Sequence, residues 1–136
     1  MKVPSSRFLT ASVVFGLGLA TGLLAQSMTD LPQRVEQKRV DLSGAPDMEV
    51  IASLVELKPG EVSQLHSHHG IEAAYVIQGA MVQEAGKGPI TLSTGTTLVN
   101  LRDVNHGALK IVGDTSLKYF AVHVVDKGKP LYDWVK

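Results

Sequence analysis

Hydrophobic and polar residues alternate over short segments of this chain, and turn residues separate the segments. Residues 48–57 (MEVIASLVEL) are rich in Val, Ile and Leu and end at the turn signal Lys58-Pro59-Gly60. After residue 30, no segment keeps the apolar period of about 3.6 residues that an amphipathic helix requires. Short strands with turns about 8–12 residues apart are typical of an all-β sandwich or barrel. The pattern therefore predicts an all-β fold.

The same pattern predicts the remaining strands. A polar lead-in, residues 28–44, precedes the main run of strands. Residues 80–93 are expected to form a hairpin with its turn at 86–89, and residues 107–126 a second hairpin with its corner at Gly113-Asp114. In the C-terminal extension, residues 129–136, the single Trp134 is expected to pack on the outside. Single strands are expected at 35–42, 73–79 and 95–101.

The first 27 residues have the pattern of an export signal. Lys2 and Arg7 give a basic start, and residues 9–25 then contain no charge. Small residues offer a cleavage point near 25–28. An uncleaved membrane anchor is the alternative, although the apolar run lies at the short end of the ~20 residues that span a bilayer and contains glycines. We therefore expect a periplasmic or secreted protein that leaves the membrane after signal removal, with N-terminal anchoring as the alternative.

Composition excludes several classes of function. The 13 basic and 13 acidic residues balance without a long run of either sign, so neither a nucleic acid nor an anionic membrane surface is expected as a partner. The chain contains no cysteine, which excludes disulfides, thiolate catalysis and thiolate metal ligands. Its hydrophobic content of 44% suffices for the core of one domain.

Three of the five histidines lie in the segment HSHH, residues 66–69. Residues two apart point to the same side of a strand, so His66 and His68 share a face and His69 points away. Glu72 shares the parity of that pair if the strand continues without a bulge. Two imidazoles and a carboxylate, with a further histidine from elsewhere, would form a mixed nitrogen and oxygen metal site. The alternative is a pair of histidines on a surface strand with no ligand.

The spacing around these residues resembles two sequence motifs of the cupin family. The first motif places Gly, His, His, Glu and Gly at fixed intervals, and the matching residues here are Gly60, His66, His68, Glu72 and Gly79. The second motif matches less fully. Its Gly and His correspond to Gly95 and His106, whereas its Pro, Gly and Asn are replaced by Leu101, Asp103 and Lys110.

The resemblance covers about residues 45–126 and implies a single small jelly-roll barrel over 45–128. It also implies that one divalent metal ion with two open coordination positions is held inside the barrel by His66, His68, Glu72 and His106. Iron, manganese, nickel, cobalt, copper and zinc all accept such ligands, and the sequence does not select among them. The departures at Leu101 and Asp103 fall in the turn that presents His106 and leave its spacing unchanged.

Four further residues are candidates for the cavity or for contacts with the metal ligands: Gln64, Asp103, Lys110 and His123. Gln64 shares the parity of the ligand histidines, and Asp103 either hydrogen-bonds an imidazole or serves only as a turn residue. Lys110 and His123 are candidate acid–base groups, although a histidine among apolar neighbours is also typical of a protein core. Tyr75 has the opposite parity to Glu72 and is expected outside.

Cupins include enzymes and non-catalytic proteins, so the fold does not determine the function. We expect a metal-dependent enzyme of the oxygenase, isomerase or lyase type that acts on a small molecule, and no residue is assigned a catalytic role. A non-catalytic module that binds a small ligand or a metal is the alternative. Exposed sheet edges and the resemblance to dimeric cupins predict a homodimer.

Overall fold

The computed structural model describes residues 30–136, so the predicted export signal lies outside the described residues. The described chain forms strands and no helix, and every strand pair is antiparallel. It contains no helix long and apolar enough to cross a membrane. The all-β jelly roll expected from the sequence is confirmed.

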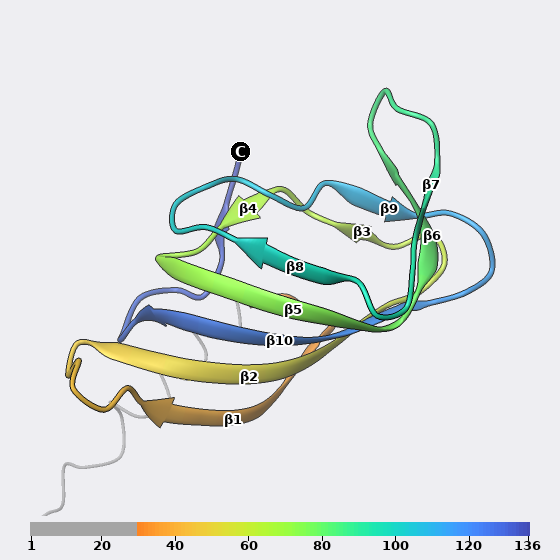
Figure 1. Cartoon of the computed structure of the whole chain (residues 1–136). Coiled ribbons are helices and arrows are strands. Elements are labelled where there is room, and N and C mark those ends of the chain that lie inside the picture. The colour runs from red at the N-terminus through yellow and green to blue at the C-terminus, as the bar shows by residue number, and fades with distance from the viewer. Residues whose placement is uncertain (1–29) are drawn as a thin grey trace, which may run out of the picture.

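Two main sheets face each other (Figure 1). The five-stranded sheet has the order β1-β2-β10-β5-β8, with strands Arg34–Asp41, Met48–Leu57, Leu117–Asp126, Gly70–Gln78 and Thr97–Asn100. The four-stranded sheet has the order β3-β9-β6-β7, with strands Val62–Ser63, Leu109–Ile111, Ala80–Glu84 and Ile90–Leu92. A short third sheet pairs β11, Asp133–Trp134, with β4, His66–Ser67.

Strand β2 has the predicted bounds, and the predicted hairpin at 80–93 is confirmed as β6 and β7. The second predicted hairpin, 107–126, is wrong. Strand β9 pairs with β3 and β6, whereas β10 pairs with β2 and β5 in the other sheet. The turn at Gly113, where φ is 99°, therefore carries the chain from one sheet to the other.

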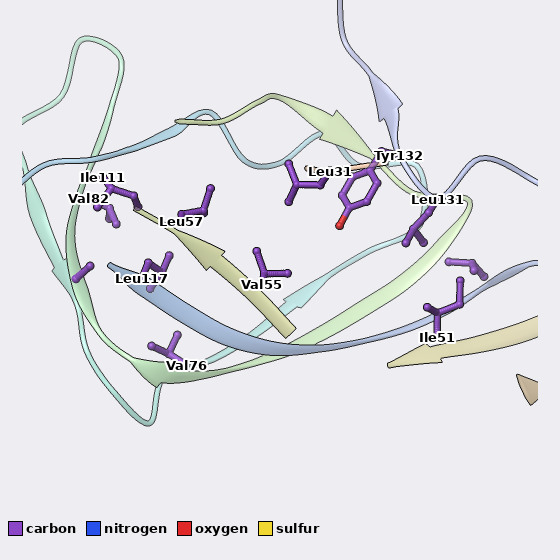
Figure 2. Close-up of a cluster of buried hydrophobic side chains, with 12 residues drawn as sticks. Leu31, Ile51, Val55, Leu57, Val76, Val82, Ile111, Leu117, Leu131 and Tyr132 are labelled. Carbon is purple, nitrogen blue, oxygen red and sulfur yellow. The ribbon is translucent and has the colours of Figure 1, made fainter. Parts of the chain in front are cut away.

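The core fills the space between the two main sheets. Alternate residues of β2, including Ile51, Val55 and Leu57, point inward and meet side chains such as Val82 and Ile111 from the opposite sheet (Figure 2). Burying each of these side chains contributes roughly 1.5–3 kcal/mol, which makes the apolar core the main stabilising element of the barrel.

Both ends of the described chain join this core. Leu31, Leu131 and Tyr132 are buried with it, and Figure 2 shows them near one another. Trp134 stacks on Tyr132, with ring centroids 5.0 Å apart and an interplanar angle of 6°. Trp134 is half-buried, and the pairing of β11 with β4 holds it over the histidines.

Candidate metal centre

Four candidate ligands come from separate segments of the barrel. His66 lies in β4, His68 follows that strand, Glu72 lies in β5, and His106 precedes β9. The backbones of His66 and His106 form a two-bond bridge, with N···O distances of 3.0 and 2.8 Å. This bridge brings together residues that lie forty positions apart in the sequence.

The loop that carries His106 depends on three residues with positive φ. Asp103 has a φ of 58°, Gly107 of 94° and Ala108 of 57°. Asp103 stands where the cupin motif has glycine, and Asp is among the residues that enter the left-handed region most readily. A Cβ at Gly107 would lie 2.5 Å from the backbone oxygen of Gln64, so only glycine fits beside His106. The departure at Asp103 therefore keeps a positive φ in this turn.

The side chains of the four candidates converge. One ligand atom from each of His66, His68, Glu72 and His106 lies within 4.8 Å of all the others. The first three side chains are buried, and His106 is partly exposed. His68 lies between β4 and β5. Its side chain still faces the same side as those of His66 and Glu72, as the alternation of residues along a strand predicted.

Backbone carbonyls orient all three candidate imidazoles in the same way. The Nδ1 atom of His66 contacts the carbonyl of Gln64 at 2.7 Å, that of His68 the carbonyl of Leu131, and that of His106 the carbonyl of Val104 at 2.9 Å. A carbonyl only accepts, so each Nδ1 carries the proton and donates it. Each Nε2 is then left with a free lone pair, which is the tautomer a metal ligand needs.

These lone pairs point at the carboxylate of Glu72. Its Oε2 lies 3.2 Å from Nε2 of His106 and 3.5 Å from Nε2 of His68, and neither Nε2 atom has a hydrogen-bond partner. Acceptor atoms held this close repel one another unless a proton or a metal cation lies between them. Because a divalent ion would satisfy all of them, the residues present fit a metal ion.

The electrostatics of Glu72 and His66 favour the ionisation states of metal ligands, whereas the carboxylate beside His106 favours the protonated form of that imidazole. Burial alone would raise the pKa of Glu72, but contacts with His106 and His68 hold it well below its usual range, so the carboxylate is charged. Burial lowers the pKa of His66 to about 4, so that imidazole is neutral at pH 7. Burial would also lower the pKa of His106, but the Glu72 carboxylate beside it raises that pKa above its usual value.

Asn100 and His123 contact Glu72 from neighbouring strands. The amide of Asn100 donates to Oε2 at 2.7 Å, and Nε2 of His123 lies 3.5 Å from Oε1. The side chain of His123 is fully buried, and neither of its ring nitrogens has a hydrogen-bond partner. Burial lowers its pKa to about 4. The sequence analysis did not identify Asn100, although it is a polar residue at an inward position of β8.

The C-terminal segment completes the surroundings of the histidines. The carbonyl of Leu131 orients His68, and the ring of Tyr132 lies 4.9 Å from that of His66 and 5.0 Å from that of His68. The ring of Trp134 lies 5.4 Å from that of His66. The last residues of the chain thus form an aromatic wall on one side of the site.

The other side of the site opens into a cavity of about 440 Å³. His66, Glu72 and His106 line it, together with mainly aliphatic side chains such as Leu57, Leu98 and Leu117. Its other polar side chains come from Ser63, Glu84, Asn100, Asn105 and Tyr119, and no lysine or arginine of the described residues 30–136 lines it. A small molecule in this cavity would have direct access to three of the four candidate ligands.

Of the four further candidates, the structure brings only His123 next to the ligand cluster. The side chains of Gln64 and Lys110 are exposed, and Gln64 contributes only its backbone carbonyl to the site. Asp103 contacts His69 at 3.3 Å rather than a candidate ligand. His69 also meets Asp133 at 2.7 Å and points away from the cluster, and Tyr75 lies outside as expected.

Several solved structures share this fold. A cupin-like protein of Thermotoga maritima aligns with a TM-score of 0.52 and 21% identity over 75% of this chain and 74% of its own. The polyketide cyclase RemF of Streptomyces resistomycificus aligns with a TM-score of 0.51 and 17% identity over 77% and 74% of the two chains. At these identities the similarity establishes the fold alone.

The DMSP lyase DddQ of Ruegeria pomeroyi aligns with a TM-score of 0.51 and 17% identity over 71% of this chain. The chain spans only 49% of the length of that lyase. No curated protein sequence matches the chain significantly. The family profile of the cupin domain, however, matches residues 53–123, which are more than half of the chain and contain all four candidate ligands. The protein belongs to the cupin family.

Proposed function

We propose that this protein is an exported cupin that holds one divalent metal ion through His66, His68, Glu72 and His106 and acts as a metal-dependent enzyme on a small molecule. The observation that carries the proposal is the convergence of four candidate ligands, three of which line a mainly aliphatic cavity. An ion bound there would act as a Lewis acid or as a centre for dioxygen, which fits an oxygenase, isomerase or lyase.

The residues of the cavity would bind and orient the substrate. Burial and the nearby Glu72 carboxylate raise the pKa of Tyr119, so its hydroxyl keeps its proton and can donate a hydrogen bond. Asn105 offers a further donor and acceptor, and the leucines exclude water from the remaining surface. Since no lysine or arginine of the described part of the chain lines the cavity, an anionic group of the substrate would find its positive partner at the metal.

The alternative is a non-catalytic module that binds a small ligand or the metal itself. Besides the candidate ligands, the ionisable side chains that the described residues contribute to the cavity wall are Glu84 and Tyr119. This small set of proton-transfer groups favours the alternative, since a catalysed proton transfer needs a group within reach of the substrate.

Metal content tests the first part of the proposal. Protein purified from its native compartment should carry one equivalent of a transition metal by elemental analysis, and His66→Ala should lose it. His69→Ala is the matched control, because His69 lies close by in the same segment and its side chain pairs with Asp133 and Asp103, away from the candidate ligands. Retention of metal by His66→Ala, or equal loss in both variants, would contradict the assigned site.

Turnover separates the enzyme from the binding module. The protein reconstituted with iron, manganese or nickel should convert a member of a small-molecule library, and Tyr119→Phe should lower kcat while the metal content stays the same. The single Trp134, 5.4 Å from His66, reports metal binding through quenching of its fluorescence. Ligands that change this signal without being converted would favour the binding module.

The export proposal rests on residues 1–27 alone. Fractionation followed by mass spectrometry of the N-terminus should find the protein outside the cytoplasm and beginning near residues 25–28. An intact N-terminus in the membrane fraction would favour the anchor, and an intact N-terminus in the cytoplasm would exclude export.

A further inference from the structure

The cavity beside the candidate metal centre holds a second carboxylate, that of Glu84. Glu84 is the last residue of β6 and shares the parity of the buried Ala80 and Val82, so it lies on the inner face of the four-stranded sheet. It also lines the cavity. The inner face of an antiparallel sheet is usually apolar, so a carboxylate at this position indicates a polar group that it binds.

Within the chain, Glu84 pairs with Lys87 in the turn between β6 and β7. The side chain of Lys87 is 69% exposed, and solvent screening leaves such exposed pairs with little net stabilisation. Lys87 does not line the cavity. A cation inside the cavity can therefore take the place of Lys87 at little cost, because a carboxylate has two oxygens and each accepts more than one hydrogen bond.

The cavity has charges of opposite sign in two places once a divalent ion is bound. His66, Glu72 and His106 line one part, where the ion outweighs the single charge of Glu72. Strand register places Glu84 away from that part. Its partner across the β6–β9 pairing is Leu109, which lies three residues after His106, and three residues of extended chain span about 10 Å.

The cavity is continuous between these two charged places. All three residues that follow His106, as far as Leu109 beside Glu84, line it. Leu98 and Leu117 of the five-stranded sheet line it as well. Such aliphatic side chains bind methylene groups and exclude water. The cavity is therefore complementary to a molecule that is charged at both ends and apolar in the middle.

We propose that Glu84 binds a protonated amine of the substrate. The substrate is then a small aliphatic molecule with a metal-binding oxygen group at one end and an ammonium group at the other. The inference rests on the proposed function for the end of the substrate that meets the metal. The ammonium donates to the carboxylate of Glu84, and hydrogen bonds between charged groups are roughly twice as strong as neutral ones. The two ends should lie on the order of 5–8 Å apart, which about four to six bonds of an aliphatic chain span.

Two probes that differ only in the ammonium group test this preference. Pentanoate and 5-aminopentanoate are titrated calorimetrically into the metal-loaded full chain. The wild type should bind 5-aminopentanoate ~10-fold more tightly than pentanoate, and Glu84→Gln should lose this preference without a loss of pentanoate affinity. Unchanged circular dichroism and metal content of Glu84→Gln would exclude misfolding.

A second variant should act in the opposite direction. Lys87→Met removes the cation that competes for Glu84 and should raise the affinity for 5-aminopentanoate a few-fold. A merely structural role of the Glu84–Lys87 pair would move both variants in the same direction. Glu56→Gln is the matched control, since Glu56 also pairs with a lysine, Lys118, but does not line the cavity, and it should leave both affinities unchanged.

A probe without a metal-binding group separates this inference from the proposed function. Butylammonium should bind the metal-free protein, as measured by saturation-transfer NMR, and Glu84→Gln should weaken that binding ~10-fold. A wild-type protein that holds no metal would contradict the proposed function, and butylammonium would still test Glu84. Equal affinities of the wild type for pentanoate and 5-aminopentanoate, a preference that survives Glu84→Gln, or no binding of butylammonium would overturn the inference.

Discussion

Both faces of the five-stranded sheet depart from the usual distribution of polar and apolar residues, because buried polar groups lie among the apolar residues of the inner face and apolar residues cover most of the outer face. On β5, the inner face carries Glu72 with Ala74 and Val76, whereas the outer face carries Ile71, Ala73, Tyr75 and Ile77. On β10, the inner face carries the fully buried His123. In an ordinary antiparallel sheet, the core side is the more apolar one.

The buried polar groups of the inner face and the exposed apolar side chains of the outer face each have a physical reason. A buried carboxylate and a buried imidazole cost free energy unless other groups satisfy them, and Glu72 is surrounded by the imidazoles and by the amide of Asn100. Apolar side chains left in water give up the free energy of burial, which only a covering partner would restore. The inner face therefore indicates a ligand, and the outer face a second protein surface.

The largest expected effect on stability comes from comparing the same substitution, Ile to Ala, on the inner and the outer face of the five-stranded sheet. Ile51→Ala on the inner face, where the side chain is 1% exposed, should destabilise the fold by ~2–5 kcal/mol. Ile71→Ala on the outer face, 46% exposed, should cost less than ~0.5 kcal/mol in a monomer. Urea unfolding at two protein concentrations measures both variants. In the predicted homodimer the wild-type stability rises with concentration, and Ile71→Ala reduces that rise. Equal losses at both positions would remove the distinction between the faces.

A second comparison uses two glutamates of the same sheet. Glu72→Gln keeps the shape of an inner side chain but removes its charge. Loss of a residue that only hydrogen-bonds a metal ligand lowers metal affinity ~10–100-fold, and loss of the charge of the ligand itself should lower it further. Glu56→Gln makes the same change at an exposed position, where Glu56 meets only Lys118, and should leave metal affinity unchanged. Competition with a chelator of known affinity measures both constants. Equal affinities for Glu72→Gln and the wild type would show that the carboxylate is not a ligand.

A smaller effect on metal affinity is expected for Asn100, which hydrogen-bonds a candidate ligand. Asn100→Ala removes the hydrogen bond to Oε2 of Glu72 and should lower metal affinity ~10–100-fold. Val99→Ala, the adjacent residue on the outer face, is the control and should change only the dimer. The same chelator competition tests both variants. A larger loss in Val99→Ala than in Asn100→Ala would mean that the two faces are not independent.

Local patterns predicted much of the fold but not the pairing between distant segments. The bounds of β2 follow from its β-branched residues and the Pro59-Gly60 stop, and the β6–β7 hairpin from its Gly-rich turn. The turn at Gly113 equally predicted a change of direction, yet it could not show that β9 and β10 enter different sheets. That choice depends on barrel closure, which involves contacts far apart in sequence.

The candidate site also combines residues that the sequence predicted with contacts that it could not predict. Alternation placed His66, His68 and Glu72 together, and the resemblance to cupins supplied His106, which the backbone bridge brings to His66. The groups that orient the imidazoles are carbonyls of Gln64, Val104 and Leu131. A carbonyl is present at every position, so no residue type in the sequence marks these contacts. They follow from the folded backbone alone.

The smallest expected effect concerns the charged residues at the margin of the outer face, such as Lys118. Lys118→Met breaks the exposed contact with Glu56 and should change the free energy of unfolding by only ~0–1 kcal/mol, because solvent screens such pairs. It also extends the apolar surface beside Phe120, so the dimer should be as stable as before or a few-fold more stable. Lys110→Met in β9 makes the same change on the other sheet and should leave the dimer unaltered. Urea unfolding and sedimentation of the two variants measure these effects. A dimer weakened by Lys118→Met would mean that the charged residues at the margin of the outer face, and not its apolar residues, hold the two copies of the predicted homodimer together.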